Sequence, residues 1–325
     1  MADHFLQRAW GLEPGARKKD FLAILDFDSA ALDRLLSLAT RMKTERALGA
    51  KAPTSTALSG LHVALLFEKP SLRTRSTFEV AIRELGADTL HLPAHFAEGT
   101  REPLEDVARN LERWVRALVI RTYGQEKAQR LATAGKNLSV VNALTDNEHP
   151  CQALADVMTM RERWGNTEGR TVAYMGDSNN VATSLTQAAV MMGVHVRLAS
   201  PSGYTLSDEA VRQAAAGARG GARIERFTDP LAAVRGADAV YTDVWASMGE
   251  EHESDHRRQV FAPYQVNAAL MAAASPQAIF MHCLPAHRDE EVTSEVIESP
   301  VSIVFDQAEN RLHTQKALLH LLLAN

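Results

Sequence analysis

The sequence predicts an α/β protein in which two doubly wound parallel-sheet domains are joined by bridging helices. Short apolar runs alternate with segments of helical periodicity, which is typical of parallel strands linked by crossover helices. A long helical pattern at 150–164 separates two such series. The length of 325 residues and the apolar content of 46% suffice for a core in each domain.

The first series begins with a helical pattern at 29–46, and a parallel sheet is expected to follow it. Apolar runs predict buried strands at 61–67, 88–92, 117–122 and 138–144. Helical patterns fill the intervals at 75–85, 103–115 and 124–134. Pro103 suits a first helical turn, and Gly86 and Gly135 suit helix ends.

The second series predicts a second sheet, with strands at 171–177, 195–199, 223–227, 238–244, 278–283 and 301–305. The amphipathic pattern at 309–323 predicts a closing helix that returns to the first domain. We expect a first domain of residues 1–148 with 309–325, and a second domain of residues 149–308. The polar stretch at 247–258 is expected to be a mobile loop.

Charge and cysteine content exclude several classes of protein. The net charge is −5 without a long basic run, so nothing indicates a nucleic-acid or membrane partner. No apolar window reaches the ~20 residues of a membrane span, and the first residues lack a secretory pattern, so we expect a cytoplasmic protein. Cys151 and Cys283 lie far apart without a C-x-x-C partner, which predicts free thiols and no metal site.

The turn after the 61–67 strand has the composition of an anion site. Ser71, Arg73, Thr74 and Arg75 supply hydroxyl and guanidinium donors where a helix begins, and free backbone N–H groups there favour an anion. The turn contains no glycine, so it is not a Walker loop. On these residues alone, a solvated helix start is an equally good interpretation.

Polar clusters follow other predicted strands, and parallel sheets gather ligands at the carboxyl ends of their strands. These clusters are Arg121, HPCQ at 149–152, GDSNN at 176–180, DVWASMG at 243–249 and HCLPAHR at 282–288. Single residues have structural alternatives, such as a helix cap for His149 or Asn179. For Arg311, near the start of the predicted closing helix, the alternative is a surface ion pair. Together they favour a single ligand cleft. GDSNN lacks the G-x-G-x-x-G fingerprint, which argues against a nicotinamide-dependent dehydrogenase.

These motifs in combination resemble one family. SLRTR is similar to the S-T-R-T-R phosphate motif of the aspartate and ornithine carbamoyltransferases, with Leu72 where threonine is more usual. HPCQ resembles their carbamoyl motif, while DVWASMG, HCLPAHR and DQAENRLHTQKA resemble the ornithine branch. The resemblance runs from about Asp26 to the C-terminus. It implies transfer of the carbamoyl group of carbamoyl phosphate to the side-chain amine of L-ornithine, with no metal or organic cofactor.

The resemblance also implies roles for individual residues. In it, Arg121 and His149 polarise the carbamoyl carbonyl, while Asp243 and Cys283 lie near the attacking amine, with Cys283 as the candidate proton acceptor. An unperturbed thiol has a pKa of ~8.5 and is a weak base unless neighbours lower that pKa. The implied carbamoyl phosphate ligands are Ser71, Leu72, Arg73, Thr74, Arg121, His149, Gln152, Cys283, Leu284 and Arg311. The implied ornithine ligands are Asn180, Asp243, Ser247 and Met248.

Several alternatives stay open at this point. The acceptor could be aspartate, N-acetylornithine, N-succinylornithine or putrescine, although Asp243 with the SMG segment favours a free amino acid. A carbamoyltransferase-like binding subunit without catalysis would be expected to have lost anion ligands that this chain retains. The family resemblance implies a homotrimer or a multiple of trimers. Many relatives reach a neighbouring subunit's site with Gln, or with Lys in the aspartate branch, where this chain has Ala97 or Glu98. Either another donor such as Thr100 or Arg101 serves there, or this shared contact is altered. Whether the reaction serves synthesis or breakdown is also open.

Overall fold

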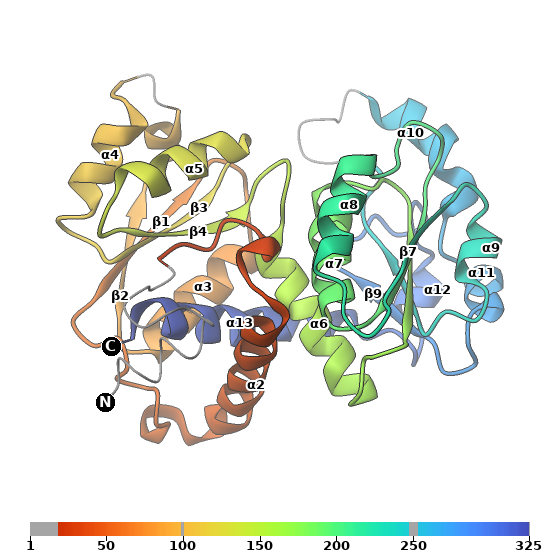
Figure 1. Ribbon diagram of the computed structural model, residues 1–325, viewed down its shortest axis with the longest axis horizontal. Helices are drawn as coiled ribbons and strands as arrows, with labels where there is room; N and C mark the ends of the chain where they lie inside the picture. Colours follow the sequence, from red (N-terminus) through yellow and green to blue (C-terminus); the bar gives the residue numbers. More distant parts are fainter. Residues whose placement is uncertain (1–18, 99–100, 247–252, 325) are drawn as a thin grey trace. The chain divides into compact units, whose positions relative to one another are not determined.

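The computed structural model describes residues 19–98, 101–246 and 253–324. The chain divides into two compact units, one of residues 1–158 with 310–325 and one of residues 159–309. Helices α6 (Pro150–Trp164) and α13 (Val304–Leu323) contribute residues to both units. Each unit contains one parallel sheet with helices around it (Figure 1), so the predicted fold class is confirmed.

The sheet of the first unit has the strand order β2-β1-β3-β4, and all of its pairs are parallel. Its strands are β1 (His62–Phe67), β2 (Asp88–Leu92), β3 (Ala117–Arg121) and β4 (Ser139–Leu144). Strands β3 and β4 are buried along their whole length, whereas β2 is a partly exposed edge. The crossover helices are α3 (Arg73–Glu84), α4 (Leu104–Leu111) and α5 (Gln125–Ala134), and α2 (Ser29–Glu45) precedes the sheet.

Apolar side chains of the first sheet pack against α4 and α5. Leu66, Leu118 and Ile120 are fully buried beside Leu104 and Leu131. The C-terminal helix α13 belongs to this unit from Asn310 onward, where Lys316 Nζ lies 3.0 Å from Glu84 of α3. Chain segments from both ends of the sequence therefore build one core, as the blue helix beside the orange ones shows (Figure 1).

The second unit has a parallel sheet of order β7-β6-β5-β8-β9. Its strands are β5 (Thr171–Met175), β6 (His195–Ala199), β7 (Ile224–Phe227), β8 (Ala239–Thr242) and β9 (Ile279–His282). Its helices are α7 (Asn180–Met191), α8 (Asp208–Ala216), α9 (Pro230–Val234), α10 (Ser254–Phe261), α11 (Ala268–Ala273) and α12 (Ser294–Ile297). Short 3-10 turns occur at Ile24–Asp26, Arg46–Lys51, Ala94–Ala97 and Ala262–Tyr264.

Two sequence predictions of secondary structure were wrong. Residues 301–305 do not form a strand, because Ser302 makes a single bridge to Phe280 and α13 begins at Val304. Their apolar run reflects a buried helix start, in which Val304 is 1% exposed. The stretch 247–258 is not wholly a loop, since residues 254–258 lie in α10; residues 247–252 lie outside the described part. Arg257 holds this polar helix in place through an ion pair with Asp177.

Strand register brings the polar clusters together at the carboxyl ends of each sheet. In the first unit, Arg121 at the end of β3 is the register partner of both Phe67 and Leu144. In the second unit, Thr242 pairs with Met175 on one side and His282 on the other. The segments that follow these strands are therefore neighbours within each unit. Among the described helices, none combines the length and apolar character needed to cross a bilayer.

Candidate active site

The first unit gathers cationic and hydroxyl side chains around the start of α3. Arg73 is the first residue of this helix, and the backbone N–H groups of its first turn have no partners within the helix. No side chain caps the helix at Leu72. Leu72 is 76% exposed, so its side chain plays no part in the core, whereas Thr74 is buried at 2%. This helix start suits an anion.

Arg311 of α13 connects the α3 start to α6 through a buried fork. Its Nη2 donates to Thr74 Oγ1 at 2.8 Å, and its Nη1 contacts Gln152 Oε1. Gln152 in turn donates from Nε2 to Asp156 at 2.8 Å, which fixes the orientation of its amide. Arg311 is 2% exposed and Gln152 is 1% exposed. Guanidinium, hydroxyl and amide groups are thus held in one fixed arrangement.

Arg121, at the end of β3, and His149, directly before α6, complete this group. Arg121 Nη1 lies 3.4 Å from Ser71 Oγ, at the edge of hydrogen-bonding distance. Burial lowers the pKa of His149 well below 6.5, and the positive charges of Arg311, Arg121 and Arg73 lower it further. His149 is therefore a neutral imidazole at pH 7, with one ring N–H to donate. The cluster combines three guanidinium groups with a neutral donor, as an oxyanion with a polarised carbonyl requires.

A lysine supports the loops that carry these groups. Lys69 follows β1, and its Nζ lies 2.6 Å from Asp146 Oδ1 and 4.3 Å from the ring centroid of Tyr123. These partners come from the loops after β4 and β3. Lys69 is 6% exposed, so the contact is held within the fold. It ties together the loops that follow β1, β3 and β4, next to Ser71, Arg121 and His149.

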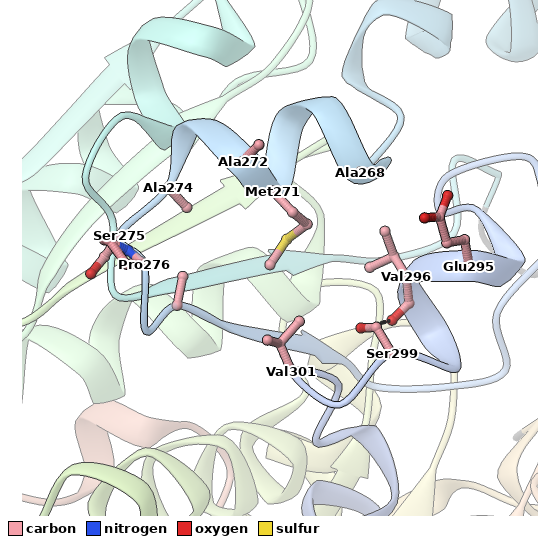
Figure 2. A pocket seen from close by; sticks show the side chains of 11 residues that line it. Ala268, Met271, Ala272, Ala274, Ser275, Pro276, Glu295, Val296, Ser299 and Val301 are labelled. Atoms are coloured by element: carbon pink, nitrogen blue, oxygen red, sulfur yellow. Dashed lines mark hydrogen bonds between the residues drawn. The ribbon is translucent and has the colours of Figure 1, made fainter.

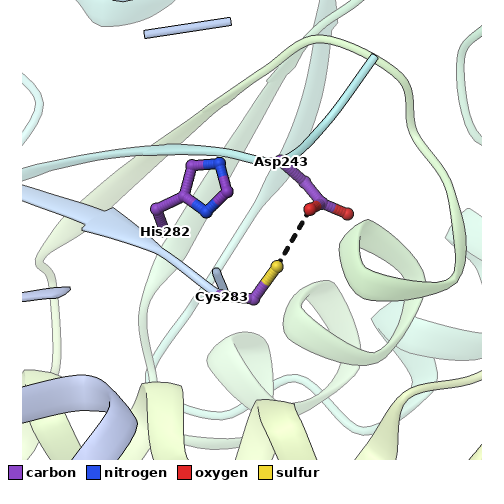
Figure 3. Close-up of side chains that lie close together, drawn as sticks. All are labelled: Asp243, His282 and Cys283. Carbon is purple, nitrogen blue, oxygen red and sulfur yellow. Dashed lines mark hydrogen bonds between the residues drawn. The ribbon is translucent and has the colours of Figure 1, made fainter. Parts of the chain in front are cut away.

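The second unit presents a carboxylate and a thiol at the ends of β8 and β9. Cys283 Sγ donates to Asp243 Oδ1 at 2.9 Å (Figure 3). The other oxygen of Asp243 accepts a hydrogen bond of 2.9 Å from Asn179 Nδ2. Asp243 is 7% exposed, and Asn180 is the first residue of α7. This group offers a carboxylate for a cationic amine beside a thiol.

His282 and Glu291 form a buried pair behind this group. His282 Nδ1 accepts from the Leu284 N–H at 2.8 Å, so its Nε2 carries the proton and donates to Glu291 Oε1 at 3.1 Å. Both side chains are fully buried. Leu284 has a φ of +56°, which is rare for leucine and typical of functional turns. The pair holds the turn that follows Cys283.

Comparison with known proteins identifies the family. Residues 19–162 match the aspartate/ornithine carbamoyltransferase, carbamoyl-P binding domain. Residues 168–322 match the aspartate/ornithine carbamoyltransferase, Asp/Orn binding domain. The chain belongs to the aspartate/ornithine carbamoyltransferase family.

Individual members of the family are similar over nearly the whole chain. The ornithine carbamoyltransferase of Thermosynechococcus vestitus is 49% identical over 308 residues, which cover 94% of this chain and 96% of the relative. The ornithine carbamoyltransferase of Methanospirillum hungatei is 48% identical over 308 residues, which cover 94% of this chain and 100% of that relative. The structure of ornithine carbamoyltransferase from Pyrococcus furiosus aligns with a TM-score of 0.90 and 44% identity, covering 94% of this chain and 97% of that one.

Some residues that the family resemblance implied as ligands lie outside the described part. These are Ser247 and Met248; the alternative loop donor Thr100 also lies outside the described residues. Ala97 is buried at the end of a 3-10 turn, while Glu98 and Arg101 are exposed.

Two groups of side chains in the described residues have metal-ligand spacing. Asp243, His282 and Cys283 have ligand atoms within 4.8 Å of one another. Both ring nitrogens of His282 are already engaged in hydrogen bonds, so this imidazole has no lone pair for an ion. His287, Glu290 and Glu291 form the second group, but Arg258 already pairs with Glu290 at 3.0 Å.

A separate apolar hollow of about 450 Å³ occurs in the second unit (Figure 2). It is lined by α11 and α12 residues and by Ala278, which precedes β9, so it lies at the amino end of that strand. Ligands of parallel sheets bind at the carboxyl ends, where Cys283 follows β9. Glu295 is the one charged residue in the lining. The hollow is therefore not part of the candidate site.

Sequence reasoning assigned no orienting role to four residues, although Asn179 and His282 lie within two of the polar clusters. Lys69, Asn179, His282 and Glu291 all contact predicted site residues or the turns that carry them. The sequence offered one indication for Asn179 and His282. Each can form side-chain hydrogen bonds and is directly next to a predicted ligand, Asn180 or Cys283. Glu291 and Asp146 gave no such signal, because their partners lie 9 and 77 residues away along the chain.

Proposed function

We propose that this protein transfers the carbamoyl group of carbamoyl phosphate to the side-chain amine of L-ornithine, giving L-citrulline and phosphate. The observation that carries this proposal is the buried group of the first unit in which Arg311 contacts Thr74 and Gln152. Arg121 lies 3.4 Å from Ser71 in the same unit, and the nearby positive charges help to keep His149 neutral. Carbamoyl phosphate combines a dianionic phosphate with a carbonyl. The cluster offers positively charged guanidinium groups to the phosphate and uncharged hydrogen-bond donors to the carbonyl oxygen.

The phosphate of the donor binds at the start of α3. Ser71 and Thr74 offer hydroxyl groups there, Arg73 offers its guanidinium, and the Leu72 N–H adds a backbone donor. Arg311 contacts Thr74 and Gln152 in the same buried group, so it can neutralise phosphate as it departs.

The carbonyl oxygen is polarised by Arg121 and His149, with help from the Thr74 hydroxyl. Negative charge develops on this oxygen in the tetrahedral transition state, and fixed donors stabilise it there. Gln152 Oε1 accepts from Arg311 and keeps a second lone pair, which can accept from the carbamoyl NH₂. The backbone carbonyls of Cys283 and Leu284 are further acceptors for this NH₂.

L-Ornithine binds through its α-amino and α-carboxylate groups to Asn180, Asp243, Ser247 and Met248. The neutral side-chain amine then attacks the carbonyl carbon, a C–N bond forms, and the C–O bond to phosphate breaks with both electrons leaving on phosphate. The amine must lose a proton. Cys283 donates to Asp243 across 2.9 Å, so the thiol proton can pass to this carboxylate as Cys283 takes the proton of the amine.

The acceptor is tested with a panel of amines. Purified protein with carbamoyl phosphate is assayed against L-ornithine, N-acetylornithine, N-succinylornithine, putrescine and L-aspartate. We expect citrulline formation to exceed every other carbamoyl product, because Asp243 suits a free α-amino group that the acylated compounds and putrescine do not present. Comparable rates with putrescine or N-acetylornithine would reject the ornithine assignment. No carbamoyl product at all would favour a non-catalytic binding subunit.

We also propose a homotrimer, or a multiple of trimers, in the cytoplasm. The resemblance of the sequence motifs to this family implies such an assembly. The net charge of −5 gives no support to a nucleic-acid partner. Sedimentation equilibrium tests the proposal, with a mass of three chains or a multiple expected.

A further inference from the structure

Asn179 occupies the N-cap position of α7 and has a second contact beyond that cap. Its Oδ1 accepts from the backbone N–H groups of Val181 at 2.9 Å and Ala182 at 3.3 Å. The hydroxyl of the buried Tyr174 lies 3.3 Å from the same oxygen. An N-cap needs only this oxygen, so the amide nitrogen remains available for another role.

The cap determines which way the amide points. Backbone N–H groups are donors only, so the atom facing Val181 and Ala182 must be the oxygen. Nδ2 therefore faces Asp243, and it donates to Oδ2 at 2.9 Å. The contact joins the turn after β5 to the end of β8, two segments 64 residues apart in the sequence.

Asp243 is held from both sides. Oδ2 accepts from Asn179, and Oδ1 accepts from the Cys283 thiol at 2.9 Å. Each carboxylate oxygen can accept more than one hydrogen bond, so both can still receive an ammonium group. Without the amide donor, the carboxylate could rotate about its last side-chain bond, where the torsional preference is broad.

We propose that Asn179 is a positioning residue for acceptor binding: its amide orients the Asp243 carboxylate and fixes it relative to Asn180, the next residue along the turn. This inference rests on the proposed function. The other interpretation is that Asn179 only caps α7, in which case its amide nitrogen has no kinetic role.

Substitutions that keep a cap separate the two interpretations. Serine and aspartate are N-caps comparable with asparagine, but neither carries the amide nitrogen. Asn179→Ser removes the donor to Asp243, and Asn179→Asp places a second carboxylate beside it. Ser207 caps α8 through a contact with Ala210 N in the same unit, so Ser207→Ala is the matched control for loss of a cap alone.

Steady-state kinetics of the full-length protein use the amine of the panel that the wild type carbamoylates fastest. We expect Asn179→Ser to lower kcat/KM for this amine about tenfold or more, as for a lost hydrogen bond to a charged group, with a larger loss for Asn179→Asp. The KM for carbamoyl phosphate and the melting temperature should stay near the wild-type values. Ser207→Ala should show a lower melting temperature with unchanged kinetics.

Wild-type acceptor kinetics in Asn179→Ser would overturn the inference while leaving the proposed function intact. An equal rise of the KM for both substrates would also overturn it, because that result indicates a general structural effect. A wild type that carbamoylates none of the amines would reject the proposed function, and this inference with it.

Discussion

Arg311 Nη2 donates to Thr74 Oγ1 across 2.8 Å, although 237 residues separate these two residues along the chain. The contact is buried, and α13 and α3 supply its two ends. One guanidinium group of the proposed carbamoyl phosphate site, that of Arg311, therefore comes from the C-terminal helix. Completion of the site therefore depends on correct docking of that helix.

Arg311→Lys tests whether catalysis needs the two-pronged guanidinium geometry of Arg311 or only its positive charge. A lysine ammonium cannot reproduce the planar fork that reaches both Thr74 and Gln152. We expect kcat to fall about 10²-fold, as when a preorganised transition-state donor is lost. The control is Arg109→Lys on α4, whose side chain is 63% exposed in a surface ion pair. Full activity of Arg311→Lys would contradict the role assigned to the fork.

Lys69→Met tests whether Lys69 holds the loops around the proposed carbamoyl phosphate site in place. Methionine keeps much of the side-chain length but loses the contacts to Asp146 and the Tyr123 ring. Because Asp146 is 56% exposed and stays solvated, the loss of stability should be at most about 1 kcal/mol. The KM for carbamoyl phosphate should still rise about tenfold, as loop positions relax. Lys136→Met, at an exposed position, provides the control. An unchanged KM would show that the loops keep their geometry without Lys69.

The depressed pKa of His149 predicts a pH dependence of stability. Below pH 6.5 the unfolded chain binds a proton at this imidazole that the folded chain refuses, so the free energy of unfolding decreases as pH falls. The limiting slope is ~1.4 kcal/mol per pH unit for one group. Burial also lowers the pKa of His320, which acts in the same direction.

Urea unfolding near neutrality and about one unit below pH 6.5 measures this slope. His149→Gln removes the titrating group and should reduce the loss of stability over this interval by about 1 kcal/mol. An equal loss in the variant and the wild type would mean that His149 titrates normally in the folded protein.

The two cysteines should differ sharply in reactivity. Burial raises the pKa of Cys151 to about 12, and its side chain is fully buried. Cys283 is partly exposed. A thiol reagent at mildly alkaline pH should therefore label Cys283 in the native protein and Cys151 only after unfolding. Cys283→Ser should abolish the native-state labelling. Rapid modification of Cys151 in this variant would contradict the buried position.

The sequence predicted most of the fold because buried parallel strands are continuous apolar runs that end at polar turns. It failed at 301–305, where an apolar run begins a helix, and at 254–258, where a helix with few apolar residues depends on the contact of Arg257 with Asp177. Periodicity carries no information on such tertiary contacts.

The same limit applies to the candidate site. The sequence motifs predicted which candidate side chains follow each strand. The contacts between these side chains depend on the packed fold. Nothing in the local sequence indicates that Asn179 faces Asp243 or that Lys69 faces Asp146. Residues that orient other side chains are hard to predict from sequence, because they carry no catalytic or ligand-binding motif of their own.

The most direct test of the proposed function is citrulline formation by wild-type protein and by Arg73→Ala, with phosphate release followed in the same samples. Arg73 begins α3 at the proposed phosphate site. We predict that the wild type forms citrulline and phosphate in equal amounts from carbamoyl phosphate and ornithine, and that Arg73→Ala folds normally but loses turnover. A folded Arg73→Ala that makes citrulline at the wild-type rate would contradict the account.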